Sequence, residues 1–288
     1  RSLIDVHTKL CKVCGLMRTD PYIDAESFAH FNNNDYRNIY MGTNQATSDF
    51  FERQVAQGKN INTFISELGI APCDTVFEIG CGAGGILKAF QDKGAYVIGC
   101  DLGESFLQYG REKGLQLIHG DVEDLSTYAP ARLVILSHVL EHFRDPIAEL
   151  KKIRPLLRKD GYLYVELPGI FWIHKAYRSD VGRYLQNAHV YHFCLQSLDY
   201  VLARAGFARL HGTEQIRALY YPSNVSASSY LHQNQQVAQQ TIAYLQKLER
   251  ERWQTELHHA VEQLYRSLRR NVRSLYRYSI RPLLKPEH

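Results

Sequence analysis

Short apolar runs alternate with helical patterns between about residues 71 and 222. The apolar runs predict strands at 75–79, 96–100, 116–119, 133–136, 161–167, 207–212 and 217–221. Helices are predicted near 85–92, 104–112, 146–157 and 196–205. Strands that alternate with helices form a mostly parallel sheet covered on both faces. The pattern therefore predicts a doubly wound α/β fold with a seven-stranded Rossmann-like sheet, which binds ligands at the carboxyl ends of its strands.

The flanking regions differ from this middle part. Residues 1–70 are mixed in character and are predicted to be helical after Asp24, whereas residues 228–288 are polar and rich in Gln and Arg. We therefore predict an N-terminal cap at 1–70, an α/β domain at 71–222 and a helical, basic extension at 228–288.

The bulk composition excludes few classes of protein. The 288 residues, 45% hydrophobic and 22% charged, are typical of a globular protein, and no apolar run reaches the roughly 18 residues of a membrane span. A net charge of +4 does not argue for a nucleic-acid partner, and none is expected. Scattered cysteines in apolar contexts favour a reducing, cytoplasmic setting.

The first strand of the α/β pattern runs into a glycine-rich turn, Glu78-Ile79-Gly80-Cys81-Gly82-Ala83-Gly84-Gly85. Glycines allow a tight turn and a close approach to a ligand, and the following helix offers free N–H groups and a positive dipole end. Asp101 ends the second strand about 20 residues later, where an acid can accept hydrogen bonds from ribose hydroxyls. These features alone fit NAD nearly as well as S-adenosylmethionine (SAM).

Three further features favour SAM. The acid Glu78 points at the turn, where it would repel a pyrophosphate and attract the ammonium of a methionine moiety. Asp121 ends the third strand, where its carboxylate can accept a hydrogen bond from an adenine amino group. The fourth strand then runs into the segment Ser137-His138-Val139-Leu140-Glu141-His142.

Together these residues resemble the class I SAM-dependent methyltransferases, in the branch with an E-I-G-C-G-x-G first motif and an H-V-L-E-H segment after strand four. The resemblance extends over about residues 70–215 and includes His189 and His192. It implies the methionine moiety at the glycines, the ribose at Asp101 and the sulfonium near Ser137. The implied SAM-binding residues are Glu78, Gly80, Gly82, Gly84, Asp101, Leu102, Asp121, Val122, Ser137 and Tyr40. The last belongs to a segment that resembles the helix capping the cofactor.

Methyl transfer needs the acceptor and the methyl group to be aligned, and the cofactor supplies the hard chemistry. A hydroxyl acceptor is helped by a base, for which histidine is the usual choice. His142 and His189 are the predicted catalytic residues because both match the family pattern, while His138 and His192 are further candidates. Each has a structural alternative, and Glu141 either orients a histidine or caps a helix.

The chain begins with half of a zinc ribbon, in which Cys11 and Cys14 are separated by two residues. Structural zinc normally takes four ligands, and no second pair of this spacing follows. His7 is a conceivable third ligand, and in relatives an upstream pair completes the site. We therefore predict no metal for this chain.

An amphipathic stripe marks the C-terminal extension as either coiled-coil-like or packed on the main domain. The stripe consists of Leu257, Val261, Leu264, Leu268, Val272 and Leu275, and basic residues become dense from Arg266 onward. Such a helix is expected to contact a partner protein, an anionic membrane surface or a neighbouring subunit, or to join a further domain. A solvated face is the alternative.

The resemblance is to bacterial methyltransferases of sugar, secondary-metabolite and surface-polysaccharide (O-antigen) pathways. It implies O-methylation of a carbohydrate hydroxyl or a related small acceptor, an inference by analogy of fold. Three alternatives stay open: C- or N-methylation of a nucleotide sugar or small metabolite, an NAD-dependent oxidoreductase, and a non-catalytic SAM-fold assembly module. The acceptor, the methylated atom and the oligomeric state are not determined by the sequence.

Overall fold

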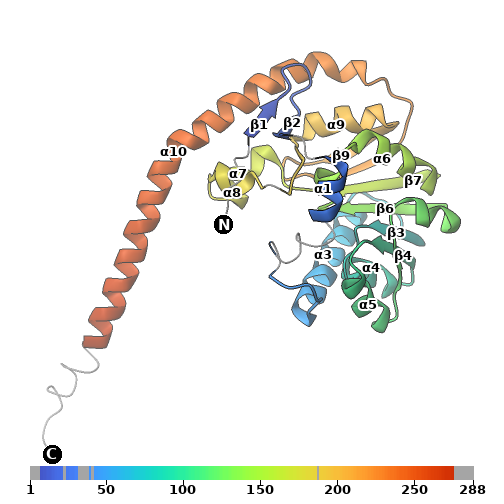
Figure 1. The fold of residues 1–288 in the computed structure, drawn as a ribbon, viewed down its shortest axis with the longest axis horizontal. Helices are drawn as coiled ribbons and strands as arrows, with labels where there is room; N and C mark the ends of the chain where they lie inside the picture. Colours follow the sequence, from blue (N-terminus) through green and yellow to red (C-terminus); the bar gives the residue numbers. More distant parts are fainter. Residues whose placement is uncertain (1–6, 22–23, 32–38, 40–41, 187, 276–288) are drawn as a thin grey trace, which may run out of the picture.

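A computed structural model describes residues 7–21, 24–31, 39, 42–186 and 188–275 (Figure 1). Its centre is a seven-stranded sheet in the order β5-β4-β3-β6-β7-β10-β9. The strands are β3 (Thr75–Ile79), β4 (Tyr96–Asp101), β5 (Gln116–His119), β6 (Ala131–Ser137), β7 (Leu157–Glu166), β9 (Phe207–Gly212) and β10 (Arg217–Pro222). Five neighbouring strands are parallel, and β10 pairs antiparallel with β7 and with β9. The predicted doubly wound α/β fold is confirmed.

Helices cover both faces of this sheet. The helices α3 (Ser48–Glu67), α4 (Gly85–Gln91) and α5 (Glu104–Glu112) pack on one face, and α6 (Pro146–Ile153) and α9 (Leu195–Arg204) pack on the other. In β3, Val76 packs in the core under α3, α4 and α5, and Phe77 packs in the core under α6 and α9. Both side chains are fully buried. This alternation follows from the two-residue repeat of a strand and gives the domain two apolar cores.

The helix after β6 is shorter than predicted. Asp145 caps it as expected, accepting hydrogen bonds from the backbone N–H groups of Ile147 (3.1 Å) and Ala148 (3.0 Å). The helix ends at Ile153 rather than near 157, and a 3₁₀ turn leads into β7. Pro155 explains the early end, because proline has no backbone N–H and its ring disfavours a continuing α-helix.

The N-terminal residues form a second, small sheet. The strands β1 (His7–Leu10) and β2 (Met17–Asp20) make a hairpin, and β2 also pairs with the short strand β8 (Tyr191–His192). Cys11 and Cys14 lie in the hairpin turn. Helix α1 (Ala25–His30) follows, with Asp24 as its N-cap. This small sheet therefore ties the start of the chain to the segment that carries His189 and His192.

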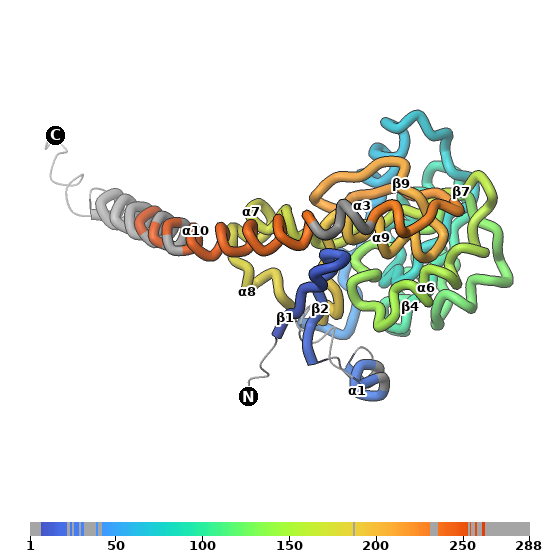
Figure 2. The backbone as a smooth tube through the Cα atoms, turned by 90° about the horizontal axis from the view of Figure 1, so that it is seen from above, coloured from blue at the N-terminus to red at the C-terminus, as the bar shows by residue number. Residues whose placement is uncertain are grey.

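The C-terminal extension is one long helix, α10 (Ser228–Leu275). Its first part lies on the main body beside α9, where Val237 and Leu248 are buried, and its second part projects away from the body (Figures 1 and 2). Leu257 and Val261 are exposed there, whereas the side chains of the later stripe residues lie outside the described part. Among the described residues, no helix is long and apolar enough to cross a bilayer.

Candidate active site

A cavity of about 730 Å³ opens at the carboxyl edge of the parallel strands. Most of the predicted site residues line it: Glu78, Gly80, Gly82, Asp101, Leu102, Asp121, Ser137 and His142. Gly84 and Val122 do not line it but are buried directly beside it in the chain, and His189 lies behind its wall. The predicted contact Tyr40 lies outside the described residues. The roles assigned to these residues stay predictions.

The glycine-rich turn after β3 forms the floor of the cavity. Gly80 and Gly82 have φ angles of +70° and +57°, which side chains other than glycine rarely adopt. A Cβ on Gly80 would lie only 2.5 Å from Cγ2 of Val139, so this position is closed by packing as well. Gly82 faces Phe50 and Gln54 of α3. The backbone can therefore approach a ligand here without a side chain between them.

Asp101, at the end of β4, connects two loops of the site. One carboxylate oxygen accepts a hydrogen bond from the backbone N–H of Gly82 (2.8 Å), and the other accepts one from Gly103 (2.7 Å). The acid predicted to hold a ribose thus also fixes the glycine turn in place. A ligand bound next to Asp101 would therefore contact two loops whose backbone is already held in position.

Glu78 is an ionisable side chain buried beneath this floor. It is 1% exposed, and its Oε2 makes no hydrogen bond to any described residue. Burial raises the pKa of Glu78 well above its ordinary value, and the nearby Asp101 raises it further. A cationic ligand group is what such a carboxyl lacks. The buried acid therefore fits the ammonium of a methionine moiety and does not fit a pyrophosphate.

The loop after β5 forms the side of the cavity that is predicted to hold the adenine. Asp121 is exposed, and its Oδ1 accepts a hydrogen bond from the backbone N–H of Glu123 (2.8 Å). Asp124 accepts a hydrogen bond from the backbone N–H of Asp121 (2.9 Å) and so shapes the loop. Leu102 is 55% exposed at the rim and offers an apolar surface to a planar ring.

Helix α3 contributes a wall that the sequence did not predict. Gln54 donates a hydrogen bond to the carbonyl of Cys81 (3.0 Å) and accepts one from the N–H of Gly85 (3.2 Å). Gln57 donates to Oγ of Ser137 (2.8 Å), and Phe50 lines the same cavity. The only sequence signal was the spacing of these three residues, which places them on one helix face.

A buried polar network supports Ser137 from behind. Oε2 of Glu166 accepts hydrogen bonds from Gln57 (3.2 Å) and from the hydroxyl of Tyr164 (3.0 Å). Oε1 of Glu166 accepts one from Nε of Arg217 (3.0 Å). Every partner of the carboxylate is thus a donor, which keeps the predicted sulfonium side of the cavity ordered.

The loop after β6 carries two of the four candidate histidines, His138 and His142, and is hydrogen-bonded to the segment that carries His189. His138 has a left-handed backbone (φ +56°) and lines the cavity with a half-exposed side chain. Its Nδ1 lies 3.6 Å from Oε1 of Glu141, within ion-pair range but too long for a hydrogen bond. Desolvation lowers the pKa of His138, but Glu141 and Glu166 raise it by more. Strained backbone of this kind occurs at functional sites.

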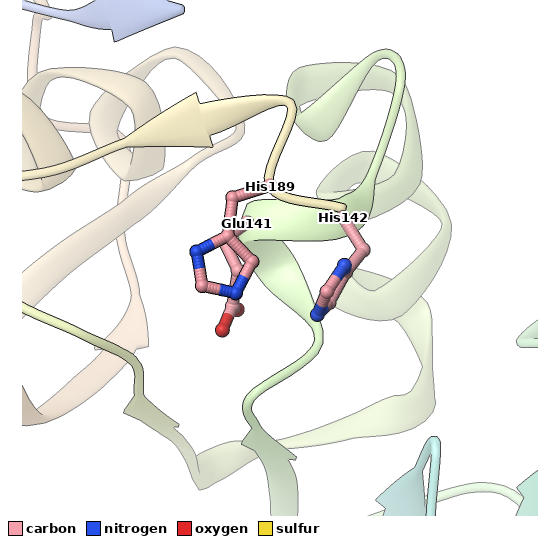
Figure 3. A group of neighbouring side chains, drawn as sticks. All are labelled: Glu141, His142 and His189. Atoms are coloured by element: carbon pink, nitrogen blue, oxygen red, sulfur yellow. The ribbon is translucent and has the colours of Figure 1, made fainter. Parts of the chain in front are cut away.

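The predicted catalytic pair, His142 and His189, lies in contact in a T-shaped arrangement with ring centroids 5.0 Å apart. Figure 3 shows the carboxylate of Glu141 beside both rings. Burial lowers the pKa of His189 to about 4. Burial raises the pKa of Glu141, but His138 and the other two histidines lower it to about 2. Glu141 caps no helix: neither carboxylate oxygen makes a hydrogen bond to a described residue.

The remaining candidates are the histidine His192 and the cysteine pair Cys11 and Cys14, and neither belongs to the cavity. His192 is buried, with Nε2 3.4 Å from the hydroxyl of Thr19, and burial lowers its pKa to about 3. At the hairpin turn, burial raises the pKa of the Cys14 thiol to about 11. Within the described residues, no third metal ligand, His7 included, joins Cys11 and Cys14 in a cluster.

The fold and the site together define a class I SAM-dependent methyltransferase: a Rossmann-like sheet with a glycine turn and a terminal acid on the neighbouring strand. A family model described as a methyltransferase domain matches residues 46–211. Because this is more than half of the chain, the chain belongs to the methyltransferase domain family, whose members use SAM.

Curated relatives match about half of the chain. A ubiquinone biosynthesis O-methyltransferase from Stutzerimonas stutzeri is 26% identical over 162 residues, which are 54% of this chain and 61% of the relative. The C-methyltransferase NovU from Streptomyces niveus is 26% identical over 146 residues, 49% of this chain and 34% of that protein. The match thus spans less than two thirds of either relative.

Among solved structures, a 1,6-didemethyltoxoflavin-N1-methyltransferase from Burkholderia thailandensis has a similar fold. The TM-score is 0.52 at 16% identity, and the likeness covers 76% of this chain and 97% of that one. That enzyme was solved with its acceptor and S-adenosylhomocysteine bound. These three proteins methylate different kinds of atom, so the shared fold does not choose the acceptor.

Proposed function

We propose that this chain transfers a methyl group from SAM to a hydroxyl oxygen of a sugar, a surface polysaccharide or a related small acceptor. The observation that carries the proposal is the position of His142: it lines the cavity that contains the glycine turn and Asp101, with His189 packed behind it. An acceptor in this cavity would thus meet an imidazole next to the cofactor. The curated O-methyltransferase relative supports oxygen as the methylated atom.

The cofactor side follows from the geometry of the turn. Glu78 would attract the ammonium of the methionine moiety, the Gly80–Gly82 backbone would lie against its chain, and Asp101 would accept from the ribose hydroxyls. Asp121 and Val122 would hold the adenine. When bound, SAM supplies a methyl group on a sulfonium, which an oxygen displaces in line to leave S-adenosylhomocysteine.

The acceptor side is formed by residues of the β6 loop. Ser137, held by Gln57, lies at the end of β6, and His138 and His142 follow on the same wall. Nδ1 of His142 donates to the carbonyl of Ala188 (2.8 Å), so Nε2 is the nitrogen that lacks a proton in the neutral ring. The ring therefore offers a fixed basic atom for an acceptor hydroxyl, used either directly or through a bound cation.

The test is a methyl-transfer assay with labelled SAM and a panel of free sugars, nucleotide sugars, polysaccharide fragments and phenols. We expect label in a hydroxylated product, and loss of at least about a hundredfold in kcat for His142→Ala with unchanged SAM affinity. Asp145→Asn, at the helix cap outside the cavity, is the control. Tight SAM binding with no transfer to any hydroxyl of the panel would overturn the proposal.

A second candidate is methylation of carbon, which the C-methyltransferase relative favours. The same assay separates the two, because a methyl group on oxygen and one on carbon differ in carbon-13 chemical shift. A product methylated on carbon would replace the first proposal with the second. An NAD-dependent reaction is disfavoured by the buried acid Glu78, which a pyrophosphate would approach at a cost.

A further inference from the structure

We propose that Glu141, His142 and His189 bind one divalent transition-metal ion, such as Zn²⁺ or Mn²⁺, and that this ion binds and orients the acceptor. Binding of the ion can be measured without any acceptor. Its use in orienting the acceptor deepens the proposed function and rests on it.

The strongest observation is a buried carboxylate without donors. Glu141 is 1% exposed, and both of its carboxylate oxygens are buried without a hydrogen bond to any described residue. Burying such a group is costly unless a charge or donors compensate for it. By contrast, the buried Glu166 nearby has donors for both oxygens. Glu141 therefore lacks donors of the kind that compensate Glu166, and a metal ion would compensate its charge.

The two imidazoles are directed toward the same place. The ligand atoms of Glu141, His142 and His189 all lie within 4.8 Å of one another (Figure 3). Among the described residues this is the one group of three or more such side chains that could hold an ion. Metal bonds of about 2.0–2.2 Å at tetrahedral angles place ligand atoms about 3.3–3.6 Å apart. Side-chain rotations that bring the most distant ligand atoms about 1 Å closer together would therefore close the site.

Backbone hydrogen bonds hold the two loops that carry these ligands. The N–H of Val190 donates to the carbonyl of Glu141 (2.9 Å), which joins the His189 segment to the loop after β6. Nδ1 of His142 bonds to the carbonyl of Ala188, and this is how metal-binding histidines are usually oriented by an outer partner. The ligands are thus positioned by the fold before any ion arrives.

The ligand set indicates the kind of ion and its use. Two imidazoles and one carboxylate suit Zn²⁺, Mn²⁺, Fe²⁺ or Co²⁺, and three protein ligands leave coordination positions open. His142 is the member of the set that lines the cavity, so an open position would face the acceptor. An acceptor hydroxyl bound there would be held next to the predicted sulfonium side at Ser137.

A histidine–carboxylate ion pair is the competing explanation. His138 lies 3.6 Å from Glu141 and, when protonated, would balance its charge without a metal. The half-exposed position of His138 makes it easy to replace without emptying the core. Removal of His138 therefore separates the two explanations: an ion site survives it, and an ion pair does not.

The experiment titrates Zn²⁺, Mn²⁺, Co²⁺ and Mg²⁺ into the whole chain after chelator treatment. The chain carries Cys11→Ser and Cys14→Ser, so that the cysteine pair of the hairpin turn cannot bind the ions. We expect one ion per chain, a Co²⁺ visible spectrum of mixed nitrogen and oxygen ligands, and weak or no Mg²⁺ binding. Glu141→Gln and His189→Gln should weaken binding at least tenfold, whereas His138→Gln should leave it unchanged. Thermal unfolding of each variant checks that it is folded.

Two results would overturn the site: no binding of any of these ions, or binding that Glu141→Gln and His189→Gln leave unchanged. The experiments distinguish failure of the metal site from failure of the proposed function. Full methyl transfer by chelated, metal-free protein would leave the function standing and remove the ion from it. One bound ion together with no transfer to any acceptor would confirm the site and overturn the function.

Discussion

Gln57 donates a 2.8 Å hydrogen bond to Oγ of Ser137, which lies 80 residues further along the chain. This contact joins α3 to the end of β6 at the point where the predicted sulfonium and acceptor sides of the cavity meet. The same amide also reaches Glu166. The N-terminal helix α3 is therefore a wall of the site as well as a cover of the sheet.

Replacing Gln57 by alanine removes a donor from Ser137 and from the buried Glu166. We expect SAM to bind about tenfold more weakly, because one such hydrogen bond is worth about 1–2 kcal/mol. Titration calorimetry measures the affinity. Lys59→Ala changes an exposed residue of the same helix and should leave it unaltered. Equal affinities for both variants would show that α3 is only a cover.

Replacing Asp101 by alanine removes the acceptor that joins the loops at Gly82 and Gly103. We expect SAM and S-adenosylhomocysteine to lose more than tenfold in affinity, because both the ribose contact and the fixed loop are lost. Asp101→Asn keeps one acceptor oxygen and should lose less. Glu112→Gln, at the exposed end of α5 and not among the residues that line the cavity, is the control. An Asp101→Ala protein that binds SAM normally would contradict the assigned role.

Replacing Gly80 by alanine should destabilise the fold through two effects. The residue would sit at φ +70°, and its Cβ would approach Val139 to 2.5 Å. Gly94→Ala is a matched control, because its φ is +89° and no atom lies within 4 Å of the added Cβ. We expect denaturant titration to show a loss of about 1–3 kcal/mol for the control and a larger one at Gly80. A Val139→Ala background should reduce the excess.

Asp199 should make stability depend on pH. Burial raises its pKa to about 6, partly offset by Arg209 and the hydroxyl of Tyr220, while Glu214 adds to the increase. The folded state then holds a proton that the unfolded chain loses near pH 4. The contribution of Asp199 to stability is therefore fully present below about pH 4 and is lost as pH rises to about 6, by at most about 3 kcal/mol. Urea titrations should show the free energy of unfolding of the parent falling relative to that of Asp199→Asn between about pH 4 and pH 6. A stability difference between the two proteins that does not change with pH would contradict the raised pKa of Asp199.

The sequence was sufficient where the signal is local. The strands repeat every two residues, and the Glu78–Gly85 turn carries its own backbone requirement, so both could be predicted. The pairing of β2 with β8 joins residues such as Met17 and His192, which no local pattern connects. The glutamines of α3 likewise act only across the fold. For Glu141 the sequence allowed two roles, capping a helix or orienting a histidine. It could not decide between them, because the sequence does not show which donors a buried carboxylate contacts.

The projecting part of α10 also governs how the molecule moves through water. The whole helix has 48 residues and extends about 72 Å at 1.5 Å per residue, so its second part reaches well beyond a compact body that is about 45 Å across. A rod attached to a sphere drags more solvent than a sphere of equal mass. A single chain will therefore elute early in size exclusion and sediment slowly, so its mass must be taken from light scattering or sedimentation equilibrium.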